Sequence, residues 1–191
     1  MKNRFEINKN GFWETSTEIG HVHDKSLCYA LINYLKEKDV KTLIDFGCGM
    51  ADYVKSIINE KIICEAYDGN PNTEILTNGI GKVLDLSKEF YLNKKVDCVL
   101  SLEVGEHIPK EYEKIFIDNL CKHSNNLIIL SWAIIGQDGD GHVNCQNNDY
   151  IISELKRRGF SYELDSSIKL RDSISNAKWF KNTIMIFKKV K

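Results

Sequence analysis

Short apolar runs alternate with segments of helical periodicity along this chain, and this alternation restricts the fold more than any other feature. The apolar runs predict strands over residues 42–46, 62–67, 82–84, 96–101, 126–131 and 183–187. Apolar side chains recur at helical spacing over residues 24–38, 50–60, about 110–122 and 149–158. Strands that alternate with helices favour βαβ units. We therefore expect an α/β fold with a doubly wound, mostly parallel sheet and helices on both faces.

The length favours a single domain that spans residues 1–191. A chain of this size buries roughly 70% of its unfolded surface, so it needs neither disulfides nor a metal to fold. The six cysteines form no C-x-x-C pair, which is typical of free thiols in a reducing compartment. The first residues lack the apolar stretch of a signal peptide, and no apolar run reaches 18 residues. We expect a cytoplasmic protein with no membrane partner.

The charge balance bears on possible partners. The chain has 26 basic and 27 acidic residues and a net charge of −1. This balance gives no electrostatic footprint for a long phosphate backbone, so nucleic acid is not the expected partner, although an RNA terminus stays open as a substrate. The sequence does not determine the oligomeric state.

A glycine-containing turn follows the first predicted strand, in the segment Asp45-Phe46-Gly47-Cys48-Gly49. Ligands of open α/β sheets bind at the carboxyl ends of strands. Glycines there let the backbone approach a ligand closely. The segment lacks the full G-x-G-x-x-G pattern of dinucleotide folds, and glycines alone would also suit an ordinary turn.

An acid at the strand end followed by G-x-G resembles the first motif of class I S-adenosylmethionine (SAM)-dependent methyltransferases. The resemblance covers about residues 24–188 and implies a Rossmann-like, seven-stranded sheet. It also implies that Asp45 organises the methionine end of SAM, while Gly47, Cys48 and Gly49 admit the adenosyl group. The chain departs from the fuller pattern at Ala51, where a third glycine often lies.

Two further acids follow the second and third predicted strands. Asp68, followed by Gly69, is placed to accept the ribose hydroxyls, although it could simply begin a turn. The resemblance implies that Asp85, with Leu86 beside it, faces the adenine amino group, and a helix N-cap is the alternative. Leu102, after the fourth strand, completes the expected cofactor-binding residues.

Acidic and imidazole side chains gather in the segment after the fourth strand. On a helical turn Glu103, Glu106 and His107 would share one face at i, i+3 and i+4. Two carboxylates on one face repel each other unless a cation or a proton intervenes. Oxygen and imidazole ligands suit a divalent ion such as Mg²⁺ or Mn²⁺. His142, just past the fifth strand, is the expected fourth ligand.

The E-x-x-E-H pattern with a later histidine is similar to the metal site of small-RNA 3′-terminal 2′-O-methyltransferases. Ubiquinone-pathway O-methyltransferases share its E-x-x-E-H part. Both families act on a hydroxyl that has a neighbouring hydroxyl. The resemblance implies that Glu106, His107 and His142 hold the metal or take the proton. The alternative is a metal-free site, in which the Glu-His pair only packs or orients the loop.

The polar, glycine-rich loop 132–148 and the N-terminal segment 1–23 are the expected walls of an acceptor pocket. His21 and His23 are further candidates for a general base. We expect O-methylation of a sugar, sugar nucleotide or glycan that has a vicinal hydroxyl, in a carbohydrate-modifying pathway. RNA 3′-terminal 2′-O-methylation, metal-free methylation of a small molecule with a histidine base, and a non-catalytic SAM-binding module are the alternatives.

Overall fold

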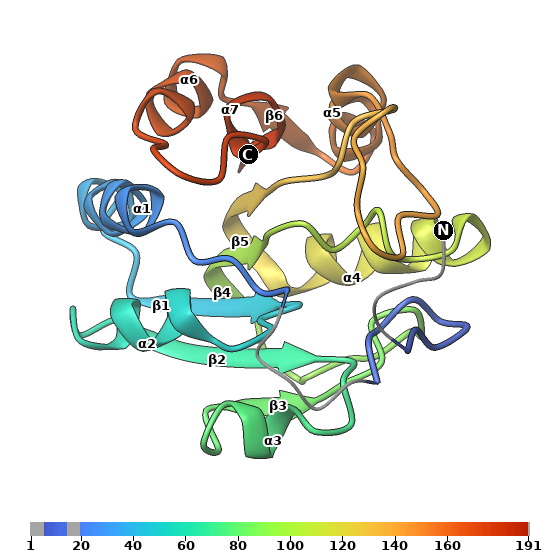
Figure 1. Cartoon of the computed structure of the whole chain (residues 1–191). Helices are drawn as coiled ribbons and strands as arrows, with labels where there is room; N and C mark the ends of the chain where they lie inside the picture. Colours follow the sequence, from blue (N-terminus) through green and yellow to red (C-terminus); the bar gives the residue numbers. More distant parts are fainter. Residues whose placement is uncertain (1–5, 15–19, 191) are drawn as a thin grey trace.

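The computed structural model describes residues 6–14 and 20–190 and forms one seven-stranded sheet (Figure 1). The strands are β1 (Thr42–Phe46), β2 (Ile63–Asp68), β3 (Gly81–Val83), β4 (Val96–Ser101), β5 (Ser124–Leu130), β6 (Phe160–Tyr162) and β7 (Met185–Lys189). Their order is β3-β2-β1-β4-β5-β7-β6. β7 runs antiparallel to both of its neighbours, and the other pairs are parallel. The predicted mostly parallel, doubly wound sheet is confirmed.

Helices cover both faces of this sheet (Figure 1). They are α1 (Lys25–Glu37), α2 (Asp52–Ile58), α3 (Thr73–Leu76), α4 (Glu113–His123), α5 (Asn148–Arg157), α6 (Leu164–Asp172) and α7 (Phe180–Thr183), with the 3₁₀ turn η1 (Lys110–Tyr112) before α4. One apolar cluster joins the sheet to α1 and α6, and a second joins it to α4 and α5.

The alternation of side chains along each strand produces these two clusters. Leu43 of β1 and Ile129 of β5 point into the cluster with α1, whereas Ile44 and Ile128, one residue away, point into the cluster with α4. All four side chains are at most 2% exposed. The strands are therefore buried on both faces, which explains their nearly continuous apolar sequences.

Helix α1 begins where the sequence predicts. Asp24 has an extended backbone, and its carboxylate accepts a hydrogen bond from the Leu27 N–H at 3.0 Å. Its other oxygen accepts from the backbone N–H groups of Asn176 and Ala177 at 2.8 and 2.9 Å. One buried carboxylate thus caps α1 and ties it to the segment between α6 and α7.

Several boundaries differ from the prediction. β5 begins at Ser124, and the last strand occupies 185–189 because residues 180–183 form the short helix α7. β6 and α6 were not predicted. All six cysteines are free. Over residues 6–14 and 20–190, no helix has the length and apolar character that a membrane crossing requires.

The strand order places a topological switch point between β1 and β4, because the chain leaves β1 toward β2 on one side and later returns to β4 on the other. The carboxyl ends of these two strands therefore flank a crevice. The turns that follow β1, β2 and β4 contain most of the predicted site residues.

Candidate active site

A cavity of about 490 Å³ opens at the carboxyl ends of β1, β2 and β4. Its lining brings together predicted residues that are far apart in sequence. On the side of β1 and β2 these are Asp45, Gly47, Cys48, Gly49, Asp68 and Gly69, with Leu86 and Leu102 nearby. Glu103, His107 and His142 line another part of the same cavity.

The turn after β1 takes a shape that only small residues allow. The N–H groups of Gly47 and Cys48 both donate to the Tyr67 carbonyl oxygen, at 2.7 and 3.1 Å. Gly47 has φ +88°, and a Cβ atom there would lie 2.2 Å from a methyl of Val104. Ala51 also takes a left-handed conformation, φ +57°, so the backbone keeps the shape that a third glycine would favour.

Two carboxylates face each other beside this turn. Asp45 is 4% exposed, and its burial, followed by the nearby charge of Asp68, raises its pKa to about 8. Asp68 accepts hydrogen bonds from the N–H groups of Gly49 and Asn70, each at 2.9 Å. Asp68 therefore shapes the turn and also lines the cavity. A ligand with a positive charge and hydroxyl groups would complement this pair.

The carboxylate of Asp85 points elsewhere. It accepts hydrogen bonds from the Asn10 side-chain amide at 2.8 Å and from the Ser87 hydroxyl at 2.6 Å. Asn10 lines the cavity, whereas Asp85 is not part of the lining. The contact of Asp85 with adenine stays a prediction.

The segment after β4 is not a helix, and the prediction of one shared helical face is wrong. Residues 105–107 form a tight turn, closed by hydrogen bonds from His107 N to Val104 O at 3.0 Å and from Ile108 N to Gly105 O at 3.2 Å. Glu103 has φ +53°, a left-handed conformation that interrupts helical geometry. The Ser131 hydroxyl accepts a hydrogen bond from the Glu103 N–H at 2.8 Å.

The turn nevertheless brings three predicted ligands together. One ligand atom from each of Glu106, His107 and His142 lies within 4.8 Å of the other two. Glu106 Oε1 is 3.9 Å from His142 Nε2. We call these residues the three-residue cluster. Glu103 lies outside this cluster, and its two oxygens accept hydrogen bonds from Gln137 Nε2 and Thr183 Oγ1 at 2.8 and 3.3 Å.

Several buried polar atoms of this cluster are unsatisfied. Glu106 is fully buried, and neither of its carboxylate oxygens has a hydrogen-bond partner among the described residues. His107 Nδ1 is likewise buried without a partner there. Unsatisfied buried polar atoms of this kind are costly and require an explanation. A divalent cation bound by oxygen and imidazole nitrogen would satisfy them, so the donor set fits the expected metal.

Burial also sets the charge states of the cluster. Burial, followed by the charge of Glu103, raises the pKa of Glu106 well above its usual value. Burial, followed by His142, lowers the pKa of His107 to about 4, so this imidazole is neutral near pH 7. A neutral imidazole can bind a metal or accept a proton.

The orientation of His142 depends on a residue that the sequence did not indicate. His142 Nδ1 lies 3.1 Å from the carbonyl oxygen of Gln137, a contact in which Nδ1 must carry the proton. Nε2 lies on the side of Glu106, 3.9 Å from its Oε1. Because Gln137 also donates to Glu103, this one residue links two predicted ligands.

The described part of the N-terminal segment covers the cavity. Phe12 packs on Gly69, where an added Cβ atom would lie 2.5 Å from its side chain. The Trp13 ring centroid lies 5.3 Å from that of His21 and 5.8 Å from that of His107. His21 and His23 also line the cavity, and burial lowers the pKa of His21. Residues 1–5 and 15–19 of this segment lie outside the described residues.

The chain shares its fold with solved structures of SAM-dependent methyltransferases. The sequence matches no protein-family model and no curated protein. Among solved structures, the chain is similar to magnesium protoporphyrin IX methyltransferase from Synechocystis PCC 6803 with bound SAM, at 17% identity and a TM-score of 0.65, over 85% of this chain and 77% of that one. At these identities the likeness concerns the fold.

Two sugar-modifying proteins share the architecture. The sugar N-methyltransferase KedS8 from Streptoalloteichus sp ATCC 53650 is 9% identical, with a TM-score of 0.68 over 93% of this chain and 98% of that one. The SAM-bound amino pentose methyltransferase CalS10 from Micromonospora echinaspora is 10% identical, with a TM-score of 0.65 over 85% and 90%.

Proposed function

We propose that this chain is a SAM-dependent O-methyltransferase that requires a divalent ion. The observation that carries the proposal is the presence of two half-sites in one cavity. The glycine turn with Asp45 and Asp68 suits the cationic, ribose-containing donor. The three-residue cluster, with its unsatisfied Glu106 oxygens, suits Mg²⁺ or Mn²⁺ and a hydroxyl acceptor.

Each group has a defined task in this proposal. Asp45 and Asp68 bind the donor, and the glycine turn lets the backbone approach it. Glu106, His107 and His142 hold the ion, with Glu103 as a candidate fourth ligand. A bound divalent ion lowers the pKa of a coordinated hydroxyl by several units, as it does for water. If one of Glu106, His107 and His142 does not bind the ion, that residue is the candidate base for the acceptor proton. The two half-sites align donor and acceptor.

The acceptor we propose is a hydroxyl of a sugar, sugar nucleotide or glycan that has a vicinal hydroxyl, because two adjacent oxygens fill two open positions on an octahedral ion. The lining supports this choice over RNA. Among the described residues that line the cavity there is no lysine or arginine, whereas several acids are present: Asp45, Asp52, Asp68, Glu103, Asp138 and Asp140. Such a lining disfavours the phosphates of a nucleic acid backbone.

Metal removal tests the proposal. We expect EDTA to abolish methyl transfer from labelled SAM to a panel of glycosides, and added Mn²⁺ to restore it. Glu106→Gln should weaken Mn²⁺ binding at least about 10-fold. The matched control is Asp138→Asn, which removes an exposed acid from the same cavity but not from the cluster. SAM binding, measured by calorimetry, should survive in both variants. Full activity in EDTA would instead favour a metal-free methyltransferase with a histidine base.

A further inference from the structure

The segment between β5 and α5, residues 131–147, carries His142 but contains no helix or strand. We call it the 131–147 loop. Its backbone is attached to the turn after β4 by two hydrogen bonds, because the N–H groups of Val143 and Asn144 both donate to the Glu106 carbonyl oxygen at 2.9 Å. These bonds place His142 beside Glu106 and His107. The position of His142 therefore depends on what holds Asn144.

Asn144 is 4% exposed and bonded on every side. Its carbonyl oxygen accepts from the indole N–H of Trp132 at 2.7 Å. Its side-chain amide donates to Glu113 Oε2 at 2.9 Å. Gln146 Nε2 donates to the Asn144 side-chain oxygen at 2.6 Å and to Glu113 Oε2 at 3.3 Å. Two side chains of the loop thus converge on the carboxylate of Glu113.

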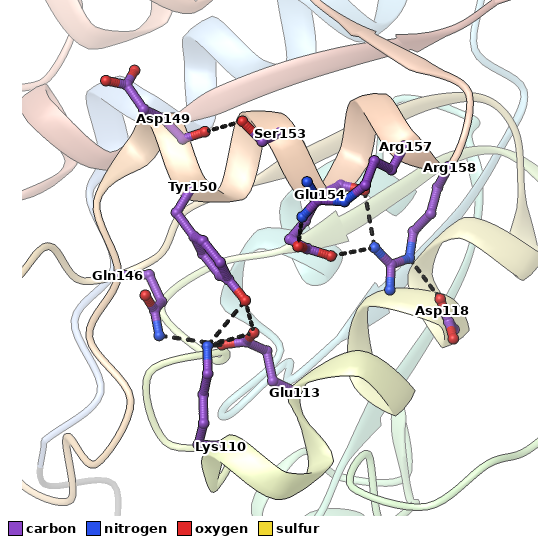
Figure 2. A network of polar contacts seen from close by, with 10 residues as sticks. All are labelled: Lys110, Glu113, Asp118, Gln146, Asp149, Tyr150, Ser153, Glu154, Arg157 and Arg158. Atoms are coloured by element: carbon purple, nitrogen blue, oxygen red, sulfur yellow. Dashed lines mark hydrogen bonds and ion pairs between the residues drawn. The ribbon is translucent and has the colours of Figure 1, made fainter.

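Glu113 is the first residue of α4 and is 4% exposed. Figure 2 shows its carboxylate surrounded by Lys110, Tyr150 and Gln146. Lys110 Nζ donates to both oxygens at 2.8 and 2.9 Å, and the Tyr150 hydroxyl donates to one at 2.5 Å. Burial would raise the pKa of Glu113, but the bonds from Lys110, Tyr150 and Asn144 outweigh it and keep the pKa low. The ionised carboxylate therefore joins η1, α5 and the loop.

We propose that Glu113 is a positioning residue for the metal and acceptor site, because it fixes the loop that carries His142 against the turn that carries Glu106 and His107. Glu113 is not part of the cavity lining, so it acts through Asn144 and not on a substrate. The role of Glu113 at the metal site rests on the proposed metal-dependent function. The hydrogen bonds between Glu113 and the 131–147 loop are independent of that proposal.

The test compares Glu113→Ala with Glu154→Ala. Glu154 belongs to the same polar network in Figure 2, where Arg158 donates to its carboxylate at 2.6 Å and to Asp118 at 2.5 Å. Its ion-pair partners among the described residues, Arg157 and Arg158, lie outside the loop. Two readouts apply to both variants. Amide hydrogen exchange at Val143 and Asn144 reports on the loop, and titration with Mn²⁺ alone reports on the cluster.

We expect Glu113→Ala to speed exchange at both amides by about 10-fold or more, since it removes hydrogen bonds to a charged group. Mn²⁺ affinity should fall about 10-fold, and SAM affinity should stay unchanged. Glu154→Ala should alter none of these values. Glu113→Gln keeps one acceptor for Asn144 and should change amide exchange and Mn²⁺ affinity in the same directions, but less. This variant supplies the test if the alanine variant does not fold.

Unchanged exchange at Val143 and Asn144 in a folded Glu113 variant would overturn the positioning role. A wild-type protein that binds no Mn²⁺ would overturn the proposed metal dependence, and the exchange measurement would still decide the role of Glu113 in the loop.

Discussion

At the scale of single residues, Asp68 combines a structural role with the binding role proposed for it. One of its oxygens accepts a hydrogen bond from the Gly49 N–H, and the other accepts one from the Asn70 N–H. The side chain also lines the cavity. Asp68→Ala should therefore weaken SAM binding by about 2–4 kcal/mol, because charge-assisted hydrogen bonds to the ribose are lost. Calorimetry provides the measurement. Asp138→Asn is the control, since it removes an exposed acid of the same cavity that lies outside the predicted cofactor-binding residues, and equal losses in both variants would contradict the assignment.

The raised pKa of Asp45 predicts that SAM binding releases a proton from the protein. Burial and Asp68 raise its pKa to about 8, so the free protein holds a proton there at pH 7. A cationic donor lowers that pKa, and binding should release up to one proton and strengthen as the pH rises from 6 to 8. Calorimetry in buffers of different ionisation enthalpy measures this release. Asp45→Asn should abolish it, and a wild-type protein without proton release would refute the prediction.

The stability of the fold depends on pH in the direction opposite to that of SAM binding. Because the folded pKa of Asp45 lies above the unfolded value of about 3.9, its contribution to stability is present at low pH and is lost as the pH rises through 8. We expect the free protein to lose stability between pH 6 and pH 8, and Asp45→Asn to remove that part of the pH dependence.

The sequence indicates most of the residues that meet in the cavity, but not the residues that hold them in place. Asp45 and Asp68 lie in the last two residues of β1 and β2, and His107 and His142 lie in the segments after β4 and β5. A sheet brings such strand ends together. The role of Gln137 has no such signal. It arises from a backbone carbonyl and a side-chain amide that meet His142 and Glu103 only after the loop folds. The same holds for Glu113, which resembles any charged residue in the first turn of a helix.

At the scale of elements, Asp24 connects the start of α1 with the segment before α7. Asp24→Ala removes the cap of α1 and leaves the N–H groups of Asn176 and Ala177 without their acceptor. We expect a loss of about 3 kcal/mol in the free energy of unfolding, from the cap and from the two unpaired donors. Urea denaturation measures this loss, and a change below about 0.5 kcal/mol would contradict it.

The same contacts make the contribution of Asp24 to folding stability dependent on pH. The hydrogen bonds from Ser26, Leu27, Ala177 and Asn176 outweigh the effect of burial and lower the pKa of Asp24. Its stabilising contribution is therefore present above the unfolded value of about 3.9 and is lost as the pH falls toward the folded value. The stability gap between wild type and Asp24→Ala should narrow below about pH 4.

Elements with strong periodicity were predictable, and short or weakly amphipathic ones were not. β4 matches its predicted range of 96–101, because four of its six residues are apolar and three of these are consecutive. β6 has three residues, and α6 buries only Ser167 and Leu170, so neither leaves a clear pattern. The segment 103–107 has a helical spacing of its charged residues, but the left-handed backbone conformation of Glu103 is incompatible with a helix there.

At the scale of the whole molecule, the strand order creates the site. The switch point between β1 and β4 opens one crevice, into which the turn after β1 and the turn after β4 both project. The 131–147 loop and the described part of the N-terminal segment line the sides of this crevice. The predicted α/β topology thus explains why two groups of residues more than fifty positions apart share one cavity, although it could not supply the loop contacts that align them.

The acid-rich lining has a consequence for turnover. Methyl transfer converts the cationic sulfonium of SAM into the neutral thioether of S-adenosylhomocysteine. A unit charge about 10 Å from a carboxylate contributes about 1–2 kcal/mol at an effective dielectric constant of about 20. The cavity should therefore bind the donor roughly 10-fold more tightly than the spent cofactor. Competitive calorimetry tests this, and equal affinities would contradict it. The reaction would then weaken the binding of its own by-product and favour its departure.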